Sequence, residues 1–105
     1  METPNLKVIQ QYAQGDAETE KMLLDIVIEE FPEEKENYYL HLEAKDAKKT
    51  QEAVHKIKHK ISILGLEKSY EIANTYEANL LENNFDLQNE FHQILENITS
   101  FIASL

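Results

Sequence analysis

Several residue types that mark common protein classes are missing or scarce in this chain of 105 residues. There is no cysteine, so neither a disulfide framework nor thiolate chemistry is available. Only two glycines and two prolines are present, which disfavours a β-sandwich or barrel, because such folds need a turn about every 8–12 residues. No apolar run reaches the roughly 18 residues that suggest a membrane helix. These absences favour one all-α domain over residues 1–105.

Positive charge is also scarce. Arginine is absent, and the formal net charge is −10. Such a charge repels a nucleic-acid backbone, and arginine is the side chain that most often reads phosphate and guanine. We therefore expect no nucleic-acid partner and no membrane insertion. No secretion signal opens the chain, so the expected location is cytoplasmic.

Apolar residues recur at helical spacing in several segments. The expected helices cover residues 5–14, 17–44, 47–64, 67–82 and a last stretch that starts at Asp86. Gly15 is expected to close the first helix, and Asp16 and Asp46 to cap the next two. Pro32 predicts either a kink or a break with a new helix start. The pattern predicts an antiparallel up-down-up-down four-helix bundle with a short extra N-terminal helix.

Six of the ten lysines fall between Lys45 and Lys60, and this stretch also carries His55 and His59. The buried face of its helix is expected to be the stripe Val54, Ile57, Ile61 and Leu64. Successive helical residues rotate by roughly 100°, which places His55 roughly 130° and His59 roughly 170° from the centre of that stripe. Both imidazoles should be exposed in a local island of positive charge, suited to carrying an anionic group.

Other side chains are expected to surround the two histidines. Ser62 extends their row at spacing i, i+4, i+7. Ile63 is expected to point away from the core and, with Leu66, to place apolar surface beside the histidines. Lys58 lies close enough for its ammonium to approach a group on the His55 ring. Two further lysines of this stretch, Lys56 and Lys60, are expected to raise the local electrostatic potential.

The run His55-Lys56-Ile57-Lys58, with Gly65 ten positions after the histidine, resembles the signature of histidine phosphotransfer (HPt) domains of multistep two-component signalling. That signature is a histidine, an apolar residue at +2, a lysine at +3, usually a small residue at +4 and glycine at +10. The resemblance covers roughly residues 5–104, because the helix layout also fits. Glu77 stands where the family often has an acid on the next helix. His59 departs from the pattern, since the family usually has glycine there.

The resemblance implies a phosphorelay carrier, not an enzyme. His55 would accept a phosphoryl group from a receiver-domain aspartate and pass it to a second receiver, while Lys58 neutralises phosphoryl charge. Gly65 would be structural, and the partner would contact Lys56, His59, Ser62, Ile63 and Leu66. The partners would be receiver domains of response regulators or hybrid histidine kinases, and the carrier would act as a monomer. It would hold no metal or cofactor, since magnesium is expected on the receiver only.

Two other interpretations stay open. A degenerate relative would be a non-catalytic interaction module that docks through the His59, Ile63 and Leu66 surface. The His55/His59 pair could instead bind a metal, as such pairs do on zinc-protein helices, although the neighbouring lysines repel cations. Whether the carrier is free-standing or part of a hybrid kinase is also open.

The remaining polar and aromatic clusters receive no functional role from the sequence. His41 and His92 are assigned none. The tyrosines are expected to pack in or beside the core with their hydroxyls at its rim. The acids Glu29-Glu30 and Glu33-Glu34 are expected to form a solvated helix surface.

Overall fold

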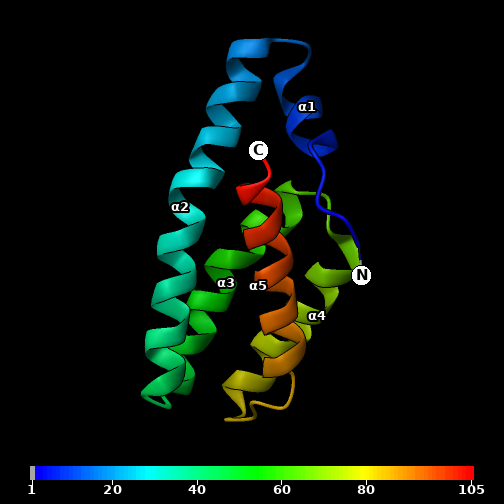
Figure 1. Ribbon diagram of the computed structural model, residues 1–105. Helices are drawn as coiled ribbons and strands as arrows, with labels where there is room; N and C mark the ends of the chain where they lie inside the picture. Colours follow the sequence, from blue (N-terminus) through cyan, green and yellow to red (C-terminus); the bar gives the residue numbers. More distant parts are fainter. Residues whose placement is uncertain (1) are drawn as a thin grey trace.

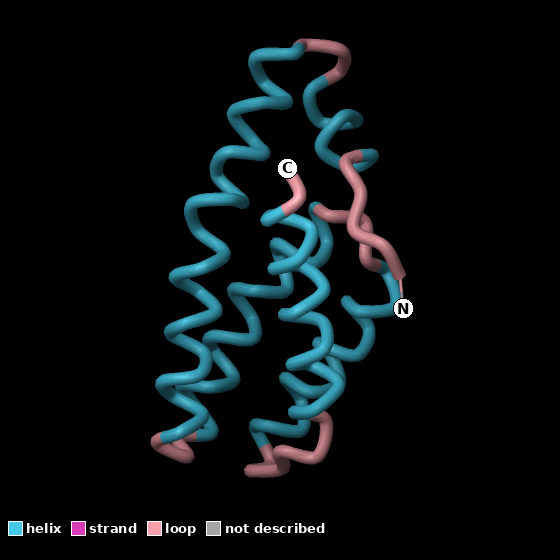
Figure 2. Tube along the Cα trace, viewed as in Figure 1, coloured by secondary structure: helices cyan, strands magenta, loops and turns pink. Residues whose placement is uncertain are grey.

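The computed structural model describes residues 2–105 of the chain, and every regular element in that range is a helix. The helices are α1 (Lys7–Ala13), α2 (Ala17–Glu43), α3 (Ala47–Ile63), α4 (Glu67–Leu81) and α5 (Gln88–Ala103). Helices α2 to α5 run alternately down and up, and α1 packs beside the upper part of α2 (Figure 1). Loops join α2 to α3 and α4 to α5 at the lower end of the molecule and α1 to α2 at its upper end, whereas the loop between α3 and α4 lies well below that upper end (Figure 2). The predicted all-α antiparallel bundle with a short N-terminal helix is confirmed.

Side-chain caps start the two helices for which the sequence predicted them. The Asp16 carboxylate accepts the backbone N–H of Glu18 at 3.1 Å, and that of Asp46 accepts the N–H of Lys49 at 3.1 Å. These bonds satisfy N–H groups that have no partner within the first helical turn. The short loop before α3 therefore places the lysine-rich helix antiparallel to the end of α2.

The last helix starts later than predicted. It begins at Gln88, and Asp86 belongs to the preceding turn. The Asn84 side chain accepts the N–H of Asp86 at 2.8 Å, which gives that N–H a partner outside any helix. The prediction that Asp86 starts the helix was therefore wrong, because the local asparagine competes for its backbone.

Of the two alternatives predicted at Pro32, a kink or a break, the break does not occur. Helix α2 continues through Pro32, which lies on its exposed side. A proline inside a helix costs about 3 kcal/mol. The same helix buries Phe31 and Tyr38 almost completely, and full burial of a large apolar side chain stabilises by roughly 1.5–3 kcal/mol. Tertiary packing thus offsets the local penalty.

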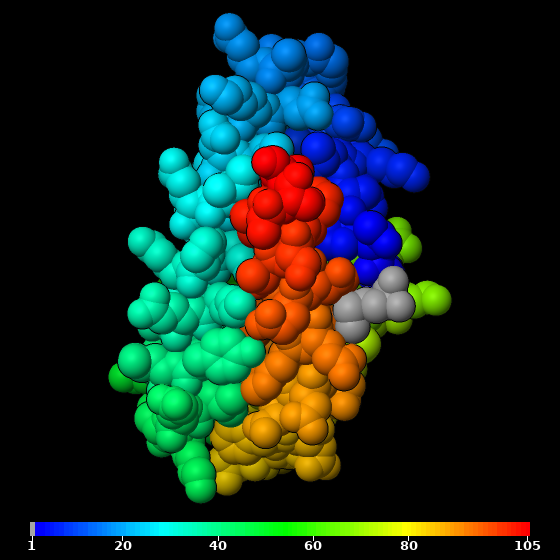
Figure 3. All heavy atoms as spheres, viewed as in Figure 1, coloured from blue at the N-terminus to red at the C-terminus, as the bar shows by residue number. Residues whose placement is uncertain are grey.

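The core lies between α2, α3, α4 and α5. Its largest fully buried side chains are Tyr38, Tyr76, Phe31 and Phe91. On the face shown in Figure 3, α5 fills the space between α2 and the N-terminal segment. Within residues 2–105 no helix is long and apolar enough to cross a membrane.

Candidate functional site

The exposed face of α3 carries His55, whose ring is held from the neighbouring helix. Its side chain is 55% exposed, and its Nδ1 lies 2.9 Å from Oε2 of Glu77 on α4. A carboxylate can only accept, so Nδ1 must carry the hydrogen of this bond. In the neutral ring the lone pair is then on Nε2. The structure therefore presents His55 as an exposed imidazole in a fixed orientation.

Glu77 is itself fixed by three partners. Its Oε1 accepts from Lys58 Nζ at 2.7 Å, and its Oε2 accepts from Gln51 Nε2 at 2.7 Å as well as from His55. Burial alone would raise the pKa of Glu77, but the hydrogen bonds from Lys58 and Gln51 outweigh burial and lower it. The group that orients His55 is thus a carboxylate that stays ionised at neutral pH.

Lys58 lies beneath this carboxylate and not in the solvent. Its side chain is only 9% exposed, and Nζ donates to Asn74 Oδ1 at 2.9 Å besides Glu77. The same ammonium stands 5.3 Å from the centre of the Tyr70 ring. The sequence placed Lys58 near His55, and the structure shows that Glu77 lies between them.

Lys60 differs from its expected role. Its ammonium is buried against α2, 2.8 Å from Glu30 Oε1 and 3.2 Å from Glu34 Oε2. Burial lowers the pKa of Lys60, but the two carboxylates more than compensate and raise it. Its charge is therefore neutralised between helices and does not add to the potential at His55. The prediction that these acids only form a solvated surface was also wrong, because half-buried Glu34 anchors α2 to α3.

The apolar surface expected beside the histidines is absent. Leu66 is fully buried, and Ile63 is half-buried against the core. Leu66 folds under the end of α3 after the turn at Gly65, with its N–H bonded to Ile61 O at 3.2 Å. The segment before α1 also crosses this end of α3, where Asn5 N–H donates to Leu64 O at 2.9 Å. A helical wheel of α3 contains neither the turn that leads to Leu66 nor the segment before α1, so it could not predict this burial.

His59 and Ser62 are exposed, as predicted. The His59 ring packs edge-to-face with the His55 ring, with centroids 5.4 Å apart and planes at 72°. Among residues 2–105 there is no group of three or more histidine, cysteine, aspartate or glutamate side chains arranged to hold a metal.

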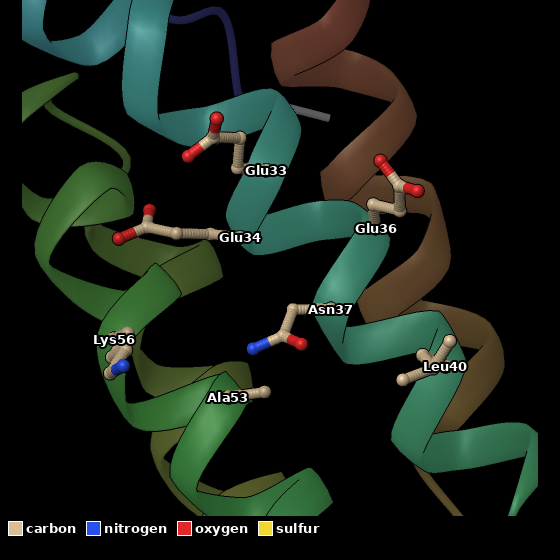
Figure 4. Close-up of a pocket in the computed structure, with 7 residues that line it drawn as sticks. All are labelled: Glu33, Glu34, Glu36, Asn37, Leu40, Ala53 and Lys56. Atoms are coloured by element: carbon tan, nitrogen blue, oxygen red, sulfur yellow. The ribbon is translucent and has the colours of Figure 1, made fainter.

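A groove between α2 and α3 leads to His55. Its two hollows share Asn37, Ala53 and Lys56 and are therefore continuous. In the hollow of Figure 4, Glu34 and Asn37 extend from α2 toward α3. The other hollow contains His55 and also His41, to which the sequence gave no role. Leu40, with 62% of its surface exposed, stands at the margin of the groove.

The groove is polarised along its length. One hollow is lined by the acids Glu33, Glu34 and Glu36 together with Lys56. The other is lined by half of the lysine cluster, Lys48, Lys49 and Lys56, together with Glu52 and Glu77. Lysine positions were visible in the sequence, but their opposition to the acids of α2 depends on how the two helices pair.

Two residues of the site were missed from the sequence. Gln51 and Asn74 hold the Glu77–Lys58 pair, and both stand at helical spacing from recognised positions. Gln51 precedes His55 by four residues, and Asn74 precedes Glu77 by three, so each shares a helix face with its neighbour. That spacing was the available signal, although it does not say which polar residue reaches across.

The family model of the Hpt domain matches residues 22–101, which is most of the chain. The chain belongs to the Hpt domain family. Neither a curated protein nor a solved structure matches it. Hpt domains are phosphocarrier modules of two-component signalling that interact with receiver domains, and they are not kinases. The family predicted from His55, Lys58 and Gly65 is thereby confirmed.

Proposed function

We propose that this Hpt domain is a phosphorelay carrier whose phosphoacceptor is Nε2 of His55. It takes the phosphoryl group from an aspartyl phosphate of one receiver domain and delivers it to an aspartate of another. The observation that carries the proposal is the bond between His55 Nδ1 and Glu77. That bond assigns the hydrogen to Nδ1 and leaves Nε2, on an exposed ring, as the nucleophile.

The proposed transfer balances without a proton shuttle. The Nε2–P bond forms as the P–O bond of the aspartyl phosphate breaks, and the electron pair of that bond stays on the aspartate carboxylate. The phosphorylated ring keeps its Nδ1 hydrogen and becomes cationic, and Glu77 faces that charge at hydrogen-bond distance. Delivery to the second receiver is the same step in reverse, with a receiver aspartate as nucleophile.

Lys58 supports this transfer through Glu77. A carboxylate beside the ring would repel an incoming phosphoryl group, because like charges at such distances disfavour each other. The Lys58 ammonium, 2.7 Å from Glu77 Oε1, cancels that charge. Lys58 thus stabilises the phosphoryl group by neutralising the neighbouring acid.

We propose that the magnesium of the reaction stays on the receiver, and that the carrier acts as a monomer.

The decisive experiment follows the label from a receiver domain that carries radiolabelled aspartyl phosphate. Wild type, His55→Gln and His59→Gln would each be mixed with that receiver. The expected result is acid-labile, alkali-stable label on wild type and His59→Gln, and none on His55→Gln. Label that survives His55→Gln but disappears in His59→Gln would show that the phosphoacceptor is His59 and not His55. No label on any form, with several receivers tried, would favour the interaction module without phosphate chemistry.

We propose that the receiver docks over the α2–α3 groove. The groove opens at His55, and Leu40 offers an exposed apolar side chain at its margin. A few residues near the centre of an interface carry most of its binding energy, and a large exposed apolar side chain beside the groove can supply one such contact. Of the docking surface expected from the sequence, His59 and Ser62 are exposed, but Leu66 is buried and Ile63 is half-buried, so its apolar part does not offer this contact.

Leu40→Glu tests the docking face. It should weaken receiver binding and slow transfer at low receiver concentration about tenfold or more, because a charge replaces an apolar contact. Met22→Glu is a matched control, since Met22 is 60% exposed on the same helix, roughly 27 Å away along the axis. Phosphorylation of His55 by a small phosphoryl donor should be unchanged in both variants. Equal transfer by Leu40→Glu and Met22→Glu would place the receiver elsewhere.

A further inference from the structure

His59 takes no part in the transfer proposed above, yet it packs directly against the acceptor ring. The two ring centroids are 5.4 Å apart, and both side chains are exposed on the same face of α3. The other ring nitrogen of His55 is occupied by Glu77. A phosphoryl group on Nε2 would therefore lie in the space that the His59 ring borders.

The cations that could meet a phosphoryl group are fewer than the lysine cluster suggests. Such a group carries about two negative charges at neutral pH. Lys58 is bonded to Glu77 and Asn74, and Lys60 is bonded between two acids of α2. Lys48, Lys49 and Lys56 line the hollow that contains His55, and Lys56 also lines the acidic hollow. Of the cationic side chains on α3, His59 is the one shown in ring contact with His55.

We propose that the His59 imidazolium donates a hydrogen bond to the phosphoryl group on His55 and thereby makes the lifetime of the phosphohistidine depend on pH. This inference rests on the proposed function and identifies a regulation of the same site. A hydrogen bond from a cation to a phosphoryl oxygen is among the strong kinds, and an imidazole ordinarily gains its charge near pH 6.5. The extra lifetime that His59 gives the phosphohistidine would thus be largest where its ring is an imidazolium and would vanish where the ring is neutral.

Other charged groups also surround the acceptor, and they set the background for this effect. Glu77 of α4 and His41 of α2 line the same hollow as His55. The groups on α3 that line the same hollow as His55 are Lys48, Lys49, Glu52 and Lys56. Of these only His41 is an imidazole like His59, so it is the group that the experiment must separate from it.

The test measures the rate at which phosphohistidine is lost between pH 6 and 8.5, without any receiver. His55 would be phosphorylated with phosphoramidate, in which the P–N bond breaks, ammonia leaves and the Nε2–P bond forms. Wild type, His59→Gln, His59→Lys and His41→Gln would be compared by ³¹P NMR. Circular dichroism would verify that each variant keeps its helices.

The expected result is a pH-dependent ratio of rates. His59→Gln should lose the group about three to ten times faster than wild type at pH 6, and at nearly the same rate at pH 8.5. His59→Lys, charged throughout, should stay slower than His59→Gln by a constant factor. His41→Gln should follow wild type at every pH.

Two results would overturn the inference alone, with His55 still phosphorylated. One is a His59→Gln to wild-type ratio that is the same at all pH values, which is what a steric role would give. The other is a His41→Gln variant that reproduces the pH dependence assigned to His59. If neither phosphoramidate nor any receiver labels His55, the proposed function fails, and this inference fails with it.

Discussion

At the scale of single residues, the site is organised around Glu77. Its carboxylate accepts hydrogen bonds from the His55 ring, the buried Lys58 ammonium and the Gln51 amide at the same time. Its position explains how the family's lysine can matter without facing solvent. The exposed His55 ring and the buried Lys58 ammonium belong to one hydrogen-bonded network.

Replacing Glu77 by glutamine tests this network. The amide keeps the size of the side chain but lacks the charge that holds the hydrogen on Nδ1 of His55 and balances Lys58. We expect phosphorylation of His55 by phosphoramidate at pH 7 to slow about tenfold or more, by analogy with outer-shell groups that orient a histidine. Unfolding in urea should also become easier by about 1–3 kcal/mol, because a buried ammonium loses its counter-charge.

The double variant Glu77→Gln with Lys58→Met provides the control. It removes the unpaired ammonium, so it should recover part of the stability but not the rate. A rate in Glu77→Gln equal to that of wild type would show that the carboxylate does not prepare the imidazole.

The residues of this site also show which of its features can be predicted from the sequence. The exposure of His55 and His59 follows from helix periodicity alone and was predicted. The pairing of Lys58 and Lys60 was not, because a long side chain reaches acids on a neighbouring helix that a helical wheel does not contain. Their net effect on the potential depends on that pairing.

At the scale of elements, the turn between α3 and α4 fixes the site's geometry. Gly65 has φ +76°, and a Cβ atom built on it would stand 2.7 Å from Asn5 Nδ2. Glu2 accepts the N–H groups of Lys68 and Ser69 at 2.9 and 2.8 Å, which caps α4 from outside. The segment before α1 thus holds the junction that sets Glu77 opposite His55.

Gly65→Ala should destabilise the fold through both strain and contact. A left-handed backbone costs an alanine about 1–2 kcal/mol, and the new methyl group must also displace the Asn5 side chain. Gly15→Ala is a matched control, because Gly15 has φ +84° but nothing within 4 Å of its added Cβ. We expect urea denaturation to show a larger loss for Gly65→Ala than for Gly15→Ala. Equal losses would mean that the Asn5 contact adds nothing to the backbone strain.

Helix limits were predictable where the cap is local in sequence and uncertain where tertiary contacts decide. Asp16 and Asp46 cap helices as expected, since the groups they bind lie within three residues. Pro32 fails to break α2 because the core holds the helix on both sides of it. Glu2 as the cap of α4 joins residues 66 positions apart, and no sequence pattern signals it.

At the scale of the whole molecule, a polar cluster lies inside the bundle and joins the three helices α2, α4 and α5. Tyr38 of α2 places its hydroxyl 2.7 Å from that of Tyr76 on α4 and 2.9 Å from His92 Nε2 on α5. If His92 is neutral, Tyr38 donates to its Nε2 and Tyr76 donates to Tyr38, so every group has a partner. The sequence placed Tyr38 and Tyr76 in or beside the core but put their hydroxyls at its rim, whereas the two hydroxyls meet inside the bundle. It also could not bring His92 to them, because that depends on how α5 packs.

This cluster should make the stability of the bundle depend on pH. Burial lowers the pKa of His92, and the nearby Glu96 carboxylate offsets this only in part. The folded protein therefore binds fewer protons at this ring than the unfolded chain, whose histidines titrate near pH 6.5. The contribution is present above that pH and is lost as the pH falls through it toward the lowered value of the folded state. The added slope cannot exceed about 1.4 kcal/mol per pH unit for one proton.

His92→Phe removes the titrating ring but keeps an aromatic side chain beside Tyr38 and Tyr39. The free energy of unfolding, measured in urea at pH 7.5, 6.5 and 5.5, should fall more steeply in wild type than in this variant. His41→Gln, which removes a histidine outside the cluster, should keep the wild-type slope. These pH values lie above the ordinary range of carboxylates, so acid titration elsewhere adds little. Parallel curves for wild type and His92→Phe would mean that protonation of His92 does not oppose folding and that its bond to Tyr38 tolerates the imidazolium.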